Sequence, residues 1–142
     1  MIMDIWKELQ DEGIDKALLD EIRQFRASHP ATPEAAARIP VPRFLYYGKE
    51  IWESAAAALL CGEHLLLAGP KATGKNVLAE NLAAVFGRPN WDVSMYVNVD
   101  AASLIGADTL KDGKVVFREG PICQCARMGG FGVLDEVNMA KN

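Results

Sequence analysis

The apolar residues in the first part of the chain recur at helical spacing. They are Ile14, Leu18, Ile22 and Phe25, and charged residues stand between them. This pattern is typical of an amphipathic helix, so we expect one helix over residues 4–27. His29-Pro30 follows this helix and ends it, because the residue before a proline avoids the helical conformation.

A short helix and a linker follow this region. Thr32 can cap a helix in which Pro33 takes the first position, where its missing N–H costs no hydrogen bond. That helix should end near Arg38. Two prolines within Ile39–Pro42 then exclude a helix and predict an extended linker. Residues 1–42 are therefore expected to form an N-terminal helical segment.

From residue 43 onward, helical and strand-like patterns alternate. We expect helices over residues 49–60, 76–86 and 119–128, and strands over residues 65–68, 91–99, 115–117 and 131–134. The run Leu65–Ala68 is apolar throughout, which favours a strand buried on both faces. Asp112-Gly113 is a hairpin turn signal, and Asp100 can cap a short turn that runs to Leu104. Strands that alternate with helices predict an α/β domain with a parallel sheet over residues 43–142.

Composition and charge narrow the class of protein. The chain has 142 residues, of which 50% are hydrophobic and 24% charged, a globular mix rather than that of a disordered protein. The net charge is −4 and there is no basic stripe, so we expect no binding to nucleic acid. The N-terminus lacks the pattern of a secretory signal, and no apolar run is long enough to span a bilayer. We therefore expect a cytoplasmic protein without a membrane segment.

The cysteines point to the same compartment. Cys61, Cys123 and Cys125 are an odd number, which favours reduced thiols over a disulfide framework. The two histidines lie far in sequence from the pair Cys123 and Cys125, and a zinc site needs about four ligands. We therefore expect ordinary thiols here rather than a metal site.

A glycine-rich loop stands between the predicted strand over residues 65–68 and the predicted helix over residues 76–86. The loop consists of Gly69, Pro70, Lys71, Ala72, Thr73, Gly74, Lys75 and Asn76. Its glycines let backbone N–H groups turn inward, and the helix N-terminus adds the positive end of its dipole. Lys75 supplies a full positive charge for terminal phosphates. We interpret the loop as a phosphate-binding site; the alternative is an ordinary glycine-rich turn with an exposed lysine.

The helix after the loop has apolar and polar positions of its own. Val77, Leu78, Leu82 and Val85 are its apolar positions, and Glu80 and Asn81 are expected to stand opposite them. Asn76 departs from the usual loop pattern, which has serine or threonine at this position to ligate magnesium. An amide oxygen is also a hard ligand, but it is longer by one atom and differently aimed. The residue types therefore favour nucleotide binding more than metal-dependent hydrolysis.

A second candidate motif is an apolar strand that ends in two carboxylates, Asp135 and Glu136. Open α/β sheets bind their ligands at the carboxyl ends of the strands. In a nucleotide hydrolase the first carboxylate holds magnesium, and the second orients and deprotonates the attacking water. The alternative is a strand end that merely meets solvent.

Together these motifs resemble the MoxR-type branch of the AAA+ ATPases. Gly69–Asn76 is similar to a Walker A motif, and Val133–Glu136 is similar to a Walker B motif. Between and after them, in the order of that family, come Asp100–Gly106, the hairpin Lys111–Phe117, Glu119–Ile122 and the ending Asp135-Glu-Val-Asn138. The resemblance covers about residues 43–142 and implies the P-loop NTPase fold, a parallel sheet with flanking helices.

The resemblance also implies an activity. Members of that branch are ATP- and Mg²⁺-dependent ATPases that remodel client protein complexes in a chaperone-like manner. They work as homo-oligomeric rings, commonly hexamers, often with a partner that contains a von Willebrand factor A domain. In such a ring the hairpin around Asp112-Gly113 would face the central pore or the client.

The resemblance assigns roles to individual residues by their position in the motifs. Lys75 would contact the β- and γ-phosphates, and Glu136 would activate water. Asn76 and Asp135 would hold Mg²⁺. The adenine would pack near Tyr46, Tyr47 and Gly48, which precede the first predicted strand of the sheet.

Some parts of the family pattern follow the Walker B motif in other members: a sensor on the fourth strand, an arginine finger and a helical lid. None is found before Asn142. The resemblance thus implies a fragment that alone hydrolyses ATP slowly or not at all. The alternative is a nucleotide-binding module with little or no hydrolysis, favoured by Asn76 and the missing parts. A small-molecule kinase fits less well, because such enzymes usually lack an ending of the form Asp-Glu-x-Asn.

Overall fold

The computed structural model describes residues 3–140, and it begins with three helices, α1 (Ile5–Asp11), α2 (Lys16–Ser28) and α3 (Pro33–Ala36). The prediction of a single helix over residues 4–27 is therefore wrong, because a turn separates α1 from α2. Gly13 has a φ of +79° there, a conformation that glycine adopts without steric cost. Asp15 then accepts a hydrogen bond from the Leu18 N–H at 3.0 Å and starts α2. The cap predicted at Thr32 is confirmed.

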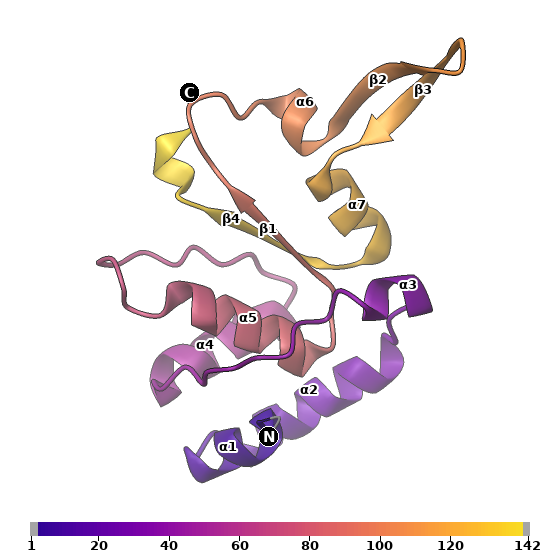
Figure 1. The fold of residues 1–142 in the computed structure, drawn as a ribbon. Coiled ribbons are helices and arrows are strands. Elements are labelled where there is room, and N and C mark those ends of the chain that lie inside the picture. The colour runs from indigo at the N-terminus through magenta and orange to yellow at the C-terminus, as the bar shows by residue number, and fades with distance from the viewer. Residues whose placement is uncertain (1–2, 141–142) are drawn as a thin grey trace.

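Helices α4 (Lys49–Leu60) and α5 (Lys75–Phe86) lie on α1 and α2 and share a core with them. Figure 1 shows α1 and α2 along one side of α4 and α5, at the end of the molecule that holds the N-terminus. The buried side chains of this helical layer are those of Ile5, Leu9, Ile14, Leu19, Ile22, Leu45, Trp52, Ala55, Ala56, Leu78, Leu82, Val85 and Phe86. Burial of this apolar surface is the main force that holds the first part of the chain to the rest.

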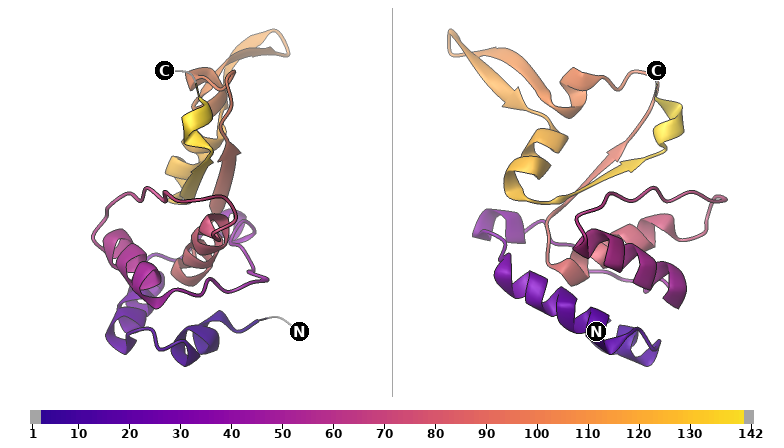
Figure 2. Two further views of the ribbon diagram at one scale, coloured as in Figure 1. Left: turned by 90° about the vertical axis from the view of Figure 1, so that its left-hand side faces the viewer. Right: turned by 180° about the vertical axis from the view of Figure 1, so that it is seen from behind.

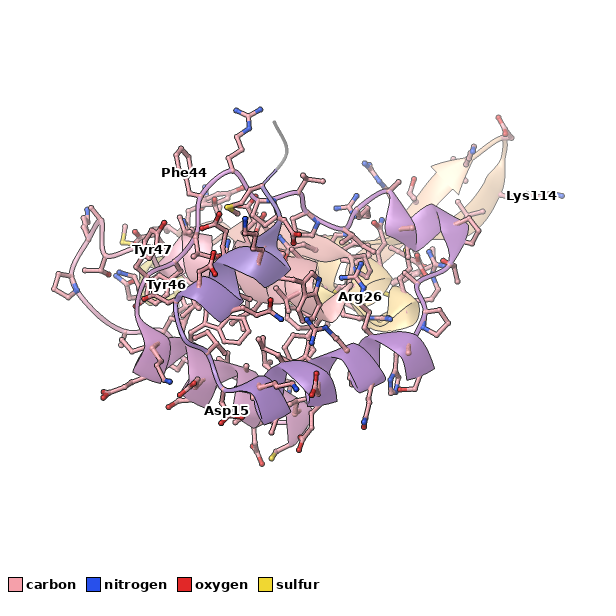
Figure 3. The ribbon with its side chains drawn as sticks, turned by 90° about the horizontal axis from the view of Figure 1, so that it is seen from below. Asp15, Arg26, Phe44, Tyr46, Tyr47 and Lys114 are labelled. Atoms are coloured by element: carbon pink, nitrogen blue, oxygen red, sulfur yellow. The ribbon has the colours of Figure 1, made fainter. Side chains whose placement is uncertain are left out.

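Two arginines add hydrogen bonds between the N-terminal segment and the rest of the chain. Arg26 of α2 donates from Nη1 to the Ala84 and Val85 carbonyls at 2.9 and 3.3 Å, at the C-terminal end of α5, where carbonyl oxygens lack helical partners. Arg88 donates to the His29 carbonyl at 2.7 Å and also to carbonyls at the end of the last α-helix. Figure 3 shows Arg26 reaching from α2 into the interior of the molecule. The division of the chain at residue 42 stays a prediction.

Four strands form two separate ladders in the described residues. Strand β1 (Asn90–Ser94) pairs in parallel with β4 (Phe131–Asp135), with Asn90 opposite Phe131 and Ser94 opposite Asp135. Strands β2 (Gly106–Lys111) and β3 (Lys114–Glu119) form an antiparallel hairpin. This confirms the hairpin predicted from Asp112-Gly113. The strand expected over residues 91–99 is shorter than predicted, since pairing ends at Ser94.

The remaining elements connect these ladders. Helix α6 (Ala101–Leu104) is capped by Asp100, as predicted, and leads into the hairpin. Helix α7 (Pro121–Met128) lies between the hairpin and β4, and the 3₁₀ helix η1 (Val137–Met139) follows β4. The views in Figure 2 show the hairpin extending away from the other elements, at the far end from α1.

The segment Leu65–Ala68 forms no strand in the structure, and this corrects the sequence-based expectation. No strand within residues 3–140 pairs with it, so its backbone lacks the ladder hydrogen bonds that define a strand. The predicted burial on both faces is also wrong, because the side chain of Leu66 is 81% exposed. Leu65 and Leu67 still pack against the helical core, so the segment contributes one face instead of two.

None of the helices within residues 3–140 is both long and apolar enough to cross a membrane.

Candidate functional site

The loop of residues 69–74 joins the segment Leu65–Ala68 to the start of α5. Two of its residues have positive φ angles, +60° at Ala72 and +84° at Gly74. Gly74 occupies the position before α5, and no side chain caps the helix there. The first N–H groups of α5 therefore have no side-chain acceptor, and the positive end of the helix dipole faces the loop. This is the arrangement in which helix N-termini bind phosphate.

Lys75 is folded back over the loop. Its Nζ donates to the carbonyl oxygens of Gly69 and Pro70 at 3.1 and 2.6 Å, and it lies 3.4 Å from the Thr73 hydroxyl. Thr73 donates from Oγ1 to the Pro70 carbonyl at 2.9 Å, which closes the same turn. The ammonium group is thus held by carbonyl dipoles at the centre of the loop. An anion there would offer full negative charge in place of these dipoles.

Asn76 and Asp135 lie side by side, although 59 positions separate them in the chain. The Asn76 Nδ2 donates to the Asp135 Oδ2 at 3.4 Å. The other carboxylate oxygen of Asp135 accepts the backbone N–H of Glu136 at 2.9 Å. The structure therefore brings the first turn of α5 and the end of β4 to one place.

Glu136 occupies a special backbone position beside this pair. Its φ of +55° lies in the left-handed region, which a residue with a Cβ adopts only at a cost of about 1–3 kcal/mol. The turn it makes ends β4 and starts η1. Within residues 3–140, the structure records no hydrogen bond between the Glu136 carboxylate and the loop. The strained turn is an observation that favours a functional role for this end of the strand.

The donor atoms at this site fit a magnesium ion only if other oxygen ligands complete its coordination. The described residues contain no group of three or more His, Cys, Asp and Glu side chains that could bind a metal by themselves. Mg²⁺ is usually held by one or two carboxylates together with phosphate oxygens and water. Asp135 and the amide oxygen of Asn76 fit such a site if a nucleotide supplies the other oxygens.

Tyr46 borders the loop from another part of the chain. A Cβ atom built on Gly74 would lie 3.2 Å from Cδ2 of the Tyr46 ring, so the ring packs against the backbone of the loop. Tyr47 and Phe44 are 69% and 70% exposed, and Figure 3 shows them on the same side of the molecule as Tyr46. Of the residues suggested for the adenine by resemblance, Tyr46 is thus a neighbour of the loop.

Sequence reasoning missed the residue that holds this segment in place. Asn81 was expected on the polar side of α5, but it is fully buried at 0% exposure. Its side chain bonds to the backbone of Phe44 and Tyr46. Helical spacing assigns polar residues to the exposed face by default. The available signal was its place directly before Leu82 and the apolar run that ends the helix.

Comparison with known proteins agrees with this geometry. Residues 64–142 match the family model described as "AAA domain (dynein-related subfamily)". The matched region contains the loop, the hairpin and the acidic pair. The "Uncharacterized protein YojN" of Bacillus subtilis (strain 168) is 33% identical over 134 residues, which cover 92% of this chain and 42% of that protein.

Staphylococcal proteins are similar as well. The "Uncharacterized protein SH1500" of Staphylococcus haemolyticus is 34% identical over 104 residues, which cover 70% of this chain and 40% of that protein. The chain therefore spans about two fifths of the length of these curated relatives. No solved structure matches the chain.

The family match decides the fold class. An AAA domain is a P-loop NTPase domain, and the parallel pair β1–β4 with its flanking helices is compatible with an incomplete sheet of that kind. The fold class expected from the sequence is thereby confirmed. The roles assigned to individual residues of the Walker A and Walker B motifs stay predictions. The chain belongs to the AAA domain family of P-loop ATPases, in the dynein-related subfamily.

Proposed function

We propose that this chain binds ATP at the loop of residues 69–76 and that the complete protein hydrolyses it. The observation that supports this most strongly is the contact between Asn76 and Asp135, since it joins the end of the loop to the acidic pair. Lys75, already inside the loop, supplies positive charge for the β- and γ-phosphates. The N-terminus of α5 supplies backbone N–H groups to the same phosphates.

Asn76 and Asp135 would hold Mg²⁺ together with phosphate oxygens. When bound, the ion would neutralise charge on the phosphates. The hydrogen bond from the Asn76 Nδ2 orients the Asp135 carboxylate and leaves the Asn76 amide oxygen for the ion. Glu136, the next residue, would orient the attacking water and accept its proton, a task for which a carboxylate at a strand end is suited.

The assembly and the client are proposals of the same kind. We infer from the family that the complete protein forms a homo-oligomeric ring, as a MoxR-type member would. Such a ring would remodel a client protein complex, with a partner that contains a von Willebrand factor A domain. The exposed hairpin β2–β3 is the element suited to contact the client. A cytoplasmic location stays a prediction from the odd number of cysteines.

A nucleotide-binding module with little hydrolysis is the second candidate, and one observation favours it. Asn76 donates its amide N–H to Asp135 instead of offering a hydroxyl oxygen. We expect this arrangement to slow metal-dependent turnover and to leave nucleotide affinity unchanged. Measurement of ATP binding and ATP hydrolysis on the same protein separates the two functions.

Calorimetric titration of ATP with Mg²⁺ tests the binding site. Lys75→Ala should weaken ATP binding at least about tenfold, because it removes the one lysine held inside the loop. Lys114→Ala, an exposed lysine at the end of the hairpin (Figure 3), is the matched control and should bind ATP as the wild type does. Equal affinities of the wild type and Lys75→Ala would contradict the proposed site.

The role of Glu136 is tested in the full-length protein. Glu136→Gln keeps the shape of the side chain but cannot accept a proton from water. We expect unchanged ATP affinity and turnover reduced by two orders of magnitude or more. Turnover at the wild-type rate would contradict the assignment, and absence of turnover in the wild type would favour the binding module.

A further inference from the structure

Asn81 is a polar residue with a fully buried side chain on an otherwise apolar part of α5. Its Oδ1 accepts the Tyr46 backbone N–H at 2.9 Å, and its Nδ2 donates to the Phe44 carbonyl at 2.9 Å. The carboxamide thus pairs with two backbone groups of one segment, as a neighbouring strand would. Burial of an unpaired amide is costly, so these two bonds account for an asparagine at this place.

The segment that Asn81 holds runs directly beside the loop. Asn81 follows Lys75 by six residues, which is about 9 Å along the helix axis. At the other end of this span the Tyr46 ring lies against Gly74, where an added Cβ would come within 3.2 Å of it. Gly48 closes the other side, since a Cβ there would lie 2.8 Å from Cε1 of the same ring. Asn81 therefore fixes the backbone that carries Tyr46 into the narrow space between two glycines.

This geometry says which end of a nucleotide the segment can meet. The loop and Lys75 take the phosphates, so the base must lie beside the loop and not inside it. Tyr46 borders the loop at Gly74, and the aromatic side chains of its neighbours in the chain, Phe44 and Tyr47, are largely exposed. Aromatic side chains stack on bases. The segment is thus suited to the base, while residues 69–76 are suited to the phosphates.

We propose that Asn81 is a positioning residue for the base of the bound nucleotide: through its two hydrogen bonds it holds residues 44–48 where they contact the base. It touches neither the base nor the phosphates. The inference rests on the proposed function, because it assumes that a nucleotide occupies the loop. It goes beyond that function in dividing affinity between a phosphate part, set by the loop, and a base part, set by a buried amide on α5.

The test compares ATP with inorganic tripolyphosphate, which has the phosphates and no base. Asn81→Ala in the full chain leaves the Tyr46 N–H and the Phe44 carbonyl without their partners. We expect about tenfold weaker binding of ATP and less than about twofold change in binding of tripolyphosphate. Phe86→Leu is the matched control on the same helix; its ring packs against Phe25 and Phe131. It should lower the melting temperature and leave the affinities for both probes unchanged.

Hydrogen exchange on the wild type supplies a second measurement that requires no variant to fold. ATP should slow backbone exchange in peptides that cover residues 44–48 and in peptides that cover residues 69–76. Tripolyphosphate should slow it only in the latter. Protection of residues 69–76 alone by ATP would overturn the inference.

The outcomes separate this inference from the proposed function. An Asn81→Ala protein that binds ATP as the wild type does, or that loses ATP and tripolyphosphate equally, overturns the role of Asn81 and leaves the loop assignment intact. A wild type that binds neither probe overturns the proposed function, and the inference fails with it. Selective loss of ATP, with base-dependent protection of residues 44–48, supports both.

Discussion

The helical layer (α1, α2, α4 and α5) and the hairpin region (α6, β2 and β3) differ in the exposure of their apolar side chains. In the helical layer, Leu19 and Leu82 are 1% and 2% exposed. On the hairpin, Leu110 and Val115 are 73% and 72% exposed. Both regions have regular secondary structure, so the difference lies in what covers it. The helices pack against one another, whereas the hairpin is held mainly by its own ladder.

The two regions therefore contribute to different properties of the protein, the helical layer to stability and the hairpin to a surface for binding. A buried apolar side chain stabilises the fold by about 1.5–3 kcal/mol through removal from water. An exposed one stabilises little and leaves an apolar surface for another molecule. The loop of residues 69–76 belongs to the first region, since α5 is part of the core. The hairpin belongs to the second, which agrees with its proposed contact with a client.

The largest expected effect is on the core of the helical layer, and it tests this contrast directly. Leu19→Ala removes a buried side chain between α2 and its neighbours, and we expect the free energy of unfolding to fall by about 2–5 kcal/mol. Leu110→Ala on the hairpin is the matched control and should change it by less than about 0.5 kcal/mol. Urea unfolding followed by circular dichroism measures both. Equal losses would show that the hairpin is packed and that the contrast is false.

Arg88 links the helical layer to α7. Its side chain donates hydrogen bonds to carbonyls at the end of α2 and at the end of α7. Arg88→Ala leaves the carbonyls of His29, Met128 and Gly129 without this donor. Since the group is partly exposed, we expect a loss of about 1–2 kcal/mol. Arg23→Ala removes an exposed ion pair with Asp20 and the contact of the guanidinium with the Trp6 ring, and it should cost less than about 1 kcal/mol. Thermal melting of both variants decides between a link and an incidental contact.

The cysteines report whether α7 covers β4. Cys125 is buried on α7, and its Sγ would lie 3.5 Å from a Cβ built on Gly132 of β4. Burial raises the pKa of the Cys125 thiol, so less of the reactive thiolate forms. Iodoacetamide should therefore label Cys125 at least about tenfold more slowly than the exposed Cys61. Equal rates by peptide mass spectrometry would mean that α7 does not pack on the sheet.

The smallest effect concerns the cap of α6. The Asp100 carboxylate accepts the Ser103 hydroxyl at 2.7 Å and its backbone N–H at 2.8 Å, and these bonds lower the pKa of Asp100. Because the pKa is lower in the folded state, the bonds stabilise α6 above the unfolded pKa. This contribution is lost as pH falls through the folded value. Asp100→Asn should make α6 less sensitive to acid, measured by amide exchange of residues 101–105 across that pH range.

Local features were predicted well because neighbouring residues decide them. Thr32 and Asp100 cap helices through side-chain oxygens that reach N–H groups three positions away. Asp112-Gly113 makes the hairpin turn because both residues have positive φ angles. The loop of residues 69–76 followed from its glycines and lysine. In each case the interacting atoms belong to residues a few positions apart.

The errors have a common physical cause in contacts between distant segments. The apolar run Leu65–Ala68 has the composition of a buried strand, but a strand also needs a partner, and none pairs with it in residues 3–140. Asn81 looks like a surface residue of α5 until the segment of residues 44–46 is placed against it. The break at Gly13 was hidden because the apolar spacing of the following helix continues the same pattern.

The sequence alone determined the glycine-rich loop, the acidic strand end, the helix caps, the hairpin and the resemblance to the AAA+ ATPases, since these depend on residue types at short spacing. Only the tertiary structure decided that Asn76 lies against Asp135, that Tyr46 lies against Gly74, and that Asn81 holds Tyr46 in place. Such contacts depend on which segments the hydrophobic core brings together, and burial, being non-directional, leaves that choice to the packing of the whole chain.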